Sequence, residues 1–113
     1  MFIFVAMEDI NLAWKTLSAR LEKQIGDELN LKAILYLIGV QELNKGIKTF
    51  SKEEKLDVLH VAVCKLLTPF GYYEFEKIDT QGWPHWKEIK PIKDLPENEQ
   101  EFLMKKAIIH YFS

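Results

Sequence analysis

Hydrophobic residues recur along this chain at helical spacing in four separate segments. In the first, from Glu8 to Ile25, apolar side chains follow one another at three- and four-residue steps: Met7, Ile10, Trp14, Leu17, Leu21 and Ile25. At about 100° per residue these positions form one narrow stripe, which predicts an amphipathic helix with a seam like that of a coiled coil. Gly26 is expected to end it.

The second predicted helix runs from Asn30 to about Asn44. Asn30 is a suitable N-cap, and Gly46 lies just beyond the expected end. Apolar residues leave little polar surface in its middle: Leu31, Ala33, Ile34, Leu35, Leu37, Ile38 and Val40. A helix that is apolar nearly all round is buried, so we expect it to be central. Gly39 should allow another backbone to approach closely.

The third segment reads "FSKEEKLDVLHVAVCKLLTP". Ser51 and Glu54 have the spacing of a capping box, and Pro69 should end the helix. The predicted core face consists of Leu56, Leu59, Ala62, Val63, Leu66 and Leu67.

A short β-hairpin is predicted next. The alternating, aromatic-rich run from Tyr72 to Ile78 suits a strand, and Asp79 to Gly82 suits a turn. A second strand from Trp86 to Ile89 could pair with the first. Because Pro84 has no N–H to donate, the pairing should be partial or at an edge.

The last helix should begin near Pro96 and continue to about Phe112, with acidic residues in its first turn. Its main apolar face consists of Leu103, Met104, Ala107, Ile108 and Tyr111. Phe102 and Ile109 lie on another side. Either this helix is wedged between other elements, or Phe102 and Ile109 form a dimer or partner contact.

These elements predict a mainly α fold, in which residues 1–113 form a single helical domain of four helices with one short hairpin before the last. A winged-helix-like topology is the alternative, and its third helix would enter the DNA major groove. The carboxylates of Glu53 and Glu54 would repel the DNA phosphates there, so we expect no nucleic-acid partner.

Composition supports a globular protein without a membrane segment. Of 113 residues, 48% are hydrophobic and 28% charged, the net charge is −2, and Arg20 is the only arginine. No apolar run is long enough to span a bilayer. The single cysteine excludes an internal disulfide and favours the cytoplasm. The opening "MFIFVA" could be an edge strand, an apolar tail against the core, or a segment before a true start at Met7.

One stripe on the third predicted helix carries metal-ligand types. Glu53, Asp57, His60 and Cys64 follow at steps of four, three and four, and the last pair has the spacing of a two-ligand helix site. The stripe lacks the paired Glu-x-x-His motifs of a di-iron bundle. We therefore predict no metal or cofactor, and an inert, buried thiol at Cys64.

The stretch "GWPHW" is the main candidate for a binding site. Trp83 and Trp86 present large, rigid surfaces beside a proline, and His85 between them can titrate. Tyr72, Tyr73 and Phe75 on the preceding strand could line the same area. Three roles are open: a cover for the core, a partner-binding surface, or a small-ligand pocket.

The stretches "LIGVQELNKG", "FGYYEFEKIDTQGWPHW" and "KKAIIHYF" resemble a family of small uncharacterised bacterial proteins of the Bacteroidetes type, over about Leu31 to Phe112. The resemblance implies a cytosolic bacterial protein and carries no activity or site residue. The residues themselves favour a non-enzymatic interaction or regulatory domain that binds a protein partner or itself. The alternative is a metal- or small-ligand-dependent enzyme using His60 and His85.

Overall fold

The computed structural model describes residues 7–26, 29–44 and 49–113. It confirms a mainly α fold with a hairpin before the last helix. The order is α1 (Met7–Ile25), α2 (Leu31–Leu43), α3 (Lys52–Leu67), β1 (Tyr73–Ile78), β2 (Pro84–Glu88) and α4 (Glu97–Tyr111). Short 3-10 turns follow α3 and precede α4. The predictions for "MFIFVA" and Gly46 lie outside the described residues.

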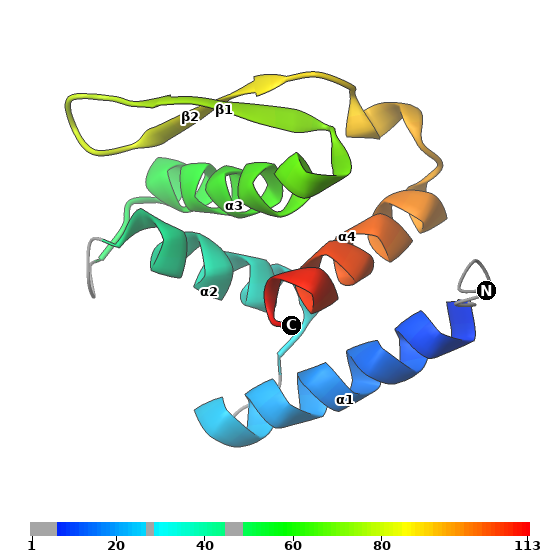
Figure 1. Ribbon diagram of the computed structural model, residues 1–113. Coiled ribbons are helices and arrows are strands. Elements are labelled where there is room, and N and C mark those ends of the chain that lie inside the picture. Colours follow the sequence, from blue (N-terminus) through cyan, green and yellow to red (C-terminus); the bar gives the residue numbers. More distant parts are fainter. Residues whose placement is uncertain (1–6, 27–28, 45–48) are drawn as a thin grey trace.

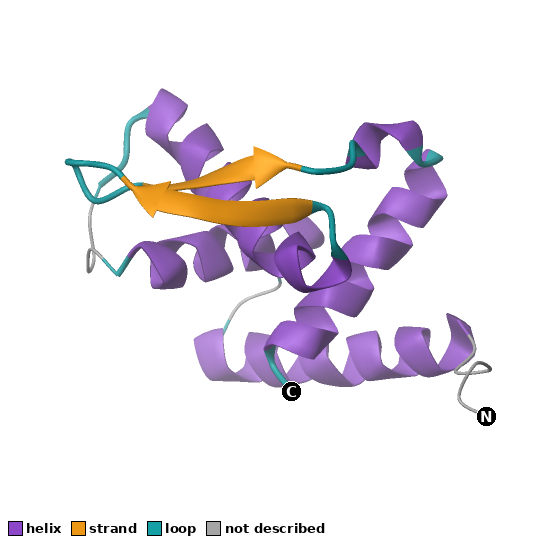
Figure 2. Cartoon of the chain, turned by 45° about the horizontal axis from the view of Figure 1, so that its top comes forward, coloured by secondary structure: helices purple, strands orange, loops and turns teal. Residues whose placement is uncertain are grey.

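The elements are stacked. The hairpin lies over α3, α2 packs beneath α3, and α4 crosses between this group and α1 (Figure 1). Viewed with the top turned forward, the two strands run across α3 while α1 remains at the far side of α4 (Figure 2). The hairpin and α1 therefore lie on opposite sides of the molecule.

Local signals start and end the helices as predicted, with one difference. The Asn30 side chain accepts from the Ala33 N–H at 2.8 Å. At α3 the capping box is complete: Glu54 N–H donates to the Ser51 hydroxyl and Ser51 N–H donates to the Glu54 carboxylate. The difference is at the end of α2, where Asn44 itself adopts the left-handed conformation, with φ of 51°.

The buried side chains of the described residues form two core clusters. The larger is shared by all four helices and includes the fully buried side chains of Ile34, Leu67 and Ile108. The smaller lies beneath the hairpin turn and is formed by Leu43, Phe50, Val58 and Val61. Trp86 packs against both clusters, so the hairpin is held down by a side chain that bridges them.

Three predicted core positions are wrong. Leu56 is 63% exposed, Leu37 on α2 is 41% exposed, and Ile25 at the end of α1 is 47% exposed. On α3 the buried residues are Val58 and Val61 instead. The reason is that α2 and the hairpin cover different sides of α3, so its buried arc is turned away from Leu56 toward the hairpin.

Helices α2 and α3 approach each other closely at Gly39. A Cβ at this position would lie 2.2 Å from the carbonyl oxygen of Val58 and 2.7 Å from its Cγ1. Both distances are far below van der Waals contact, so no residue with a side chain fits without moving α2 away from α3. The prediction that Gly39 allows close backbone approach is confirmed.

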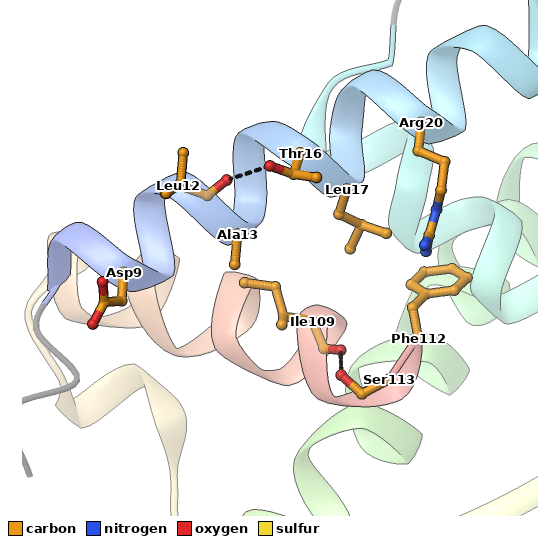
Figure 3. A pocket seen from close by; sticks show the side chains of 9 residues that line it. All are labelled: Asp9, Leu12, Ala13, Thr16, Leu17, Arg20, Ile109, Phe112 and Ser113. Carbon is orange, nitrogen blue, oxygen red and sulfur yellow. Dashed lines mark hydrogen bonds between the residues drawn. The ribbon is translucent and has the colours of Figure 1, made fainter. Parts of the chain in front are cut away.

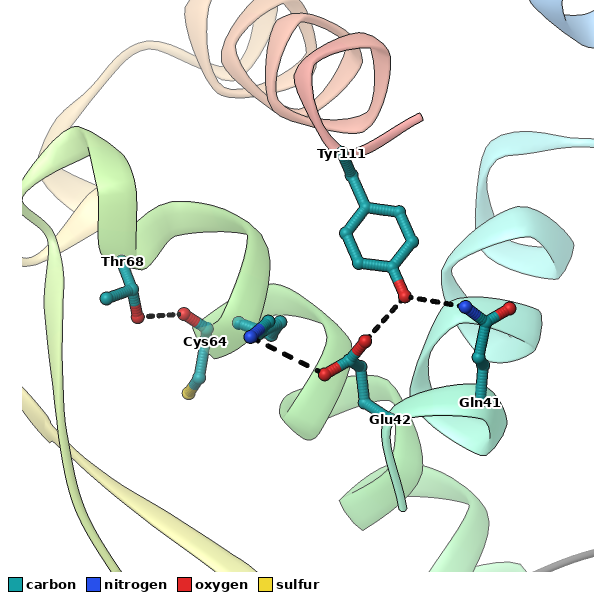
Figure 4. A network of polar contacts seen from close by, with 6 residues as sticks. Gln41, Glu42, Cys64, Thr68 and Tyr111 are labelled. Carbon is teal, nitrogen blue, oxygen red and sulfur yellow. Dashed lines mark hydrogen bonds and ion pairs between the residues drawn. The ribbon is translucent and has the colours of Figure 1, made fainter. Parts of the chain in front are cut away.

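A polar network ties the C-terminal end of α4 to α2 and α3 (Figure 4). The Tyr111 hydroxyl donates to the Glu42 carboxylate at 2.5 Å and accepts from the Gln41 side-chain amide at 3.1 Å. Lys65 on α3 lies 3.6 Å from the other Glu42 oxygen. Burial is the main cause that raises the pKa of Tyr111, and the hydrogen bond to Glu42 adds to it. The neutral phenol is therefore the form that holds the network.

Candidate functional site

The hairpin is amphipathic because of a bulge. Cross-strand partners share a face, and Phe75 pairs with Trp86 while Ile78 pairs with Pro84. The register shifts between Phe75 and Lys77, which inserts one residue. Without that insertion Ile78 would fall on the opposite face from Phe75. The other face carries the charged and polar pairs: Glu74 with Lys87 and Lys77 with His85.

A cleft of about 390 Å³ opens between the first half of α3 and the turn end of the hairpin. From α3 it is lined by Glu54, Asp57, His60 and Val61. The hairpin contributes Asp79, Gln81, Trp83, Pro84, His85 and Trp86. Two features that are far apart in the sequence therefore meet here: the aromatic turn and part of the acidic and histidine stripe of α3.

Asp79 organises the turn that forms one wall of this cleft. One carboxylate oxygen accepts the N–H groups of Gln81 and Trp83, each at 2.9 Å. The other oxygen lies 2.8 Å from His85 Nε2. The hydrogen bond with His85, followed by the one from Trp83, lowers the pKa of Asp79 from 3.8 to about 2. An ionised carboxylate can only accept a hydrogen bond, so Nε2 of His85 carries a proton and donates a hydrogen bond to Asp79.

Acidification is expected to loosen the turn. The pKa of Asp79 is lower in the folded protein than in the unfolded chain, so its contribution to stability is present above about pH 4 and disappears as the pH falls toward about 2. The stability advantage of the wild type over Asp79→Asn should therefore shrink across this interval, in urea unfolding followed by tryptophan fluorescence. Asp94→Asn, on an exposed residue of the linker, is the control. An advantage that is constant with pH would contradict the assigned role of Asp79.

Trp83 and Trp86 have both a packing role and a place in the cleft. Each is half-buried and lines the opening. Trp83 packs against the smaller core cluster, with its ring 6.4 Å from that of Phe50 in an edge-to-face arrangement. The predicted role as a cover for the core fits this packing, and the same side chains are placed to touch a bound molecule.

The two tyrosines are placed differently from the indoles. Tyr73 is buried and makes an edge-to-face contact with the His60 ring at 6.2 Å, which supports that side chain from behind. Tyr72 is half-buried beneath the Lys90 ammonium group, 4.6 Å from its ring centre. Neither is among the residues that line the cleft.

The histidines do not all converge. His60 and His85 line the cleft, whereas His110 lies at the other end of the domain against Phe70, with 5.7 Å between ring centres. A role for His60 and His85 in binding a small ligand stays a prediction.

The metal-ligand stripe on α3 is divided by burial. Cys64 is fully buried with its sulfur 3.3 Å from His60 Nε2, while Asp57 is exposed toward the cleft. Burial, with a smaller effect of the Glu88 charge, raises the pKa of the Cys64 thiol to about 12, so it is not a thiolate nucleophile. In the described part of the chain, no three histidine, cysteine or acidic side chains are grouped to hold a metal ion.

Phe102 and Ile109 on α4 are both half-buried, and only Ile109 packs against the larger core cluster. Ile109 also lines a groove between α1 and the end of α4. This packing and the contacts of α4 with both α1 and α3 support the wedged position predicted for this helix.

Sequence reasoning named Phe75 as a residue that could line this area, but it missed Ile78. Phe75 is 50% exposed and Ile78 is 64% exposed, although both lie on the apolar face of the hairpin. Alternation placed both residues in the first strand. The bulge that places both on one face has no signal in the sequence, and neither does the limited reach of α3 beneath the strands.

Comparison of the chain with protein-family models, with curated proteins and with solved structures finds no match. The resemblance to a Bacteroidetes-type family stays a prediction, and so does a winged-helix relationship. No helix among the described residues has the length and apolar character needed to cross a membrane. The site geometry is therefore the main guide to function.

Proposed function

We propose that this chain is a small, non-enzymatic interaction domain of the cytoplasm that binds a protein partner through its hairpin. The contact surface consists of the cleft beside α3 and the exposed apolar side chains of Phe75 and Ile78. The observation that carries this proposal is the exposure of these two residues on the face where Trp86 is anchored.

The surface has the composition of an interaction hot spot. Aromatic side chains with restricted motion supply contact area at a small loss of conformational entropy. Phe75 is held by an edge-to-face contact with Trp86, with ring centres 5.8 Å apart, and Trp86 is anchored in the core. An apolar, preorganised centre surrounded by Asp57, Asp79 and His85 resembles the core and polar rim of protein interfaces.

The cleft suits binding better than covalent catalysis. Its described lining contains no hydroxyl, thiol or amine, so its only possible nucleophiles are carboxylates and imidazoles. The Asp79–His85 pair resembles a catalytic dyad, but its carboxylate also holds two backbone N–H groups of the turn. The pair therefore has a structural role that explains its geometry.

The test uses two substitutions on exposed positions, Phe75→Ser and Ile78→Ser. Partners are captured from a lysate of cells that produce the protein, and the affinity of each purified partner is then measured by calorimetry. Each substitution is expected to weaken a true partner by roughly tenfold or more. Lys87→Ser, on the opposite face of the hairpin, is the matched control and should bind like the wild type. Equal affinity of all four proteins would refute the proposed surface.

A further inference from the structure

A groove runs between α1 and the C-terminal end of α4, on the side of the molecule away from the hairpin cleft (Figure 3). It has a volume of about 470 Å³. Its lining on α4 is apolar except at the end of the chain, with Ile109, Phe112 and Ser113. On α1 it is lined by Asp9, Leu12, Ala13, Thr16, Leu17 and Arg20.

Asp9, Leu12, Ala13, Thr16 and Arg20 form one stripe beside the stripe that enters the core, and Leu17, which is 7% exposed, belongs to both. Leu12 in the middle of it is 65% exposed, more than any other large hydrophobic residue described. Asp9 and Arg20 close the two ends of the stripe, and both are exposed. Neither forms an ion pair with another residue that the structure describes. They are eleven residues apart, about 16 Å along the helix, which is too far for them to pair with each other.

The stripe is complementary to itself when it is turned end for end. In an antiparallel copy, Asp9 falls opposite Arg20. The exposed Leu12 falls opposite Leu17, of which only 7% is exposed because it packs in the larger core cluster. Ala13 and Thr16 meet at the centre, where small side chains allow helix axes to approach closely. The charges match at both ends, the exposed Leu12 of each copy lies just inside them, and the smallest residues match at the midpoint.

We propose that this groove is occupied by α1 of a second copy of the chain, in a two-fold symmetric dimer. An isologous interface requires that each contact occur twice with the residues exchanged, and the stripe meets this requirement with opposite charges. The α1 and α4 helices of both copies then form a four-helix arrangement that covers Leu12 and Ile109. This dimer uses a surface separate from the hairpin, so it does not depend on the proposed partner contact.

Charge reversal provides a sharp test. In a homodimer of Asp9→Arg, the substituted side chain of each copy faces Arg20 of the other. In a homodimer of Arg20→Asp, the substituted side chain of each copy faces Asp9 of the other. The dissociation constant of each variant homodimer is expected to be roughly tenfold higher or more, because like charges are brought together at the rim of the interface. Equimolar mixing of the two variants creates only attractive pairs and should restore the dimer. Light scattering after size exclusion measures all three samples against the 13.3 kDa chain mass.

The controls separate this effect from a general change of charge or stability. Lys15→Glu alters the net charge as Arg20→Asp does, but it lies on the other side of α1 and should leave the dimer intact. Thermal melting checks that each variant is folded. A wild type that remains monomeric at high micromolar concentration would overturn the proposal, and so would mixing that fails to restore the dimer. A hairpin variant such as Ile78→Ser should dimerise like the wild type.

Discussion

Gly39→Ala is expected to lower the free energy of unfolding by about 3 kcal/mol, although alanine is the better helix former by about 1 kcal/mol. The added methyl group would lie 2.2 Å from the Val58 carbonyl oxygen, so α2 and α3 must separate along their contact. Urea unfolding followed by circular dichroism measures the change. A loss of this size corresponds to a fall in melting temperature of roughly 10 °C for a domain of this length.

The position of the clash predicts which second substitution fails to help. Val58→Ala removes the Cγ1 contact of 2.7 Å but leaves the carbonyl oxygen in place, because that atom belongs to the backbone. The double variant should therefore recover little of the lost stability and should add the loss from a cavity. Lys32→Ala, on an exposed site of the same helix, is the control. A stability of Gly39→Ala equal to that of the wild type would show that the helices are farther apart.

Tyr111→Phe should cost about 1.5 kcal/mol at neutral pH, since it removes the hydroxyl that donates to the Glu42 carboxylate. The ring and its packing against Phe112 are retained, so the loss of stability is due to the missing hydroxyl group. In the variant the Glu42 carboxylate still has Lys65 beside it and is partly exposed to water. The expected loss of stability is therefore at the lower end of the range for a hydrogen bond to a charged group.

The difference between wild type and Tyr111→Phe should depend on pH in one direction. The pKa of Tyr111 is raised in the folded protein, so its contribution is complete below about pH 10 and is lost as the pH rises further toward the folded-state pKa. Unfolding measured from pH 8 to pH 11 should show the two proteins converging at the alkaline end. A constant difference would mean that Tyr111 ionises as readily in the folded protein as in the unfolded chain.

The helices could be predicted because their signals are local. The capping box of Ser51 and Glu54, the N-cap Asn30 and the apolar periods depend on residues within one or two turns. The hairpin was predicted for the same reason, from the alternation before Asp79 and the turn after it. The second strand began two residues earlier than predicted, at Pro84, because proline is tolerated at the first position of a strand.

The candidate site could be predicted only in part. The aromatic turn was identified, with Trp83, His85 and Trp86, since tryptophan next to proline is conspicuous in any sequence. The partnership of these residues with His60 and Asp57 depends on the hairpin lying over α3. No local signal specifies that placement, because it results from the packing of Trp86 against both core clusters.

The four helices, the caps at Asn30 and Ser51, the hairpin and the glycine at which α2 meets α3 all follow from local signals in the sequence. Tertiary structure alone decided that Leu56 is exposed while Val58 and Val61 are buried, and that Phe75 and Ile78 extend beyond α3. It also placed Leu12 beside Ile109 in a groove with a charge at each end. The physical reason is range: hydrogen bonds and periodicity act within a few residues, whereas burial depends on which distant elements cover a side chain.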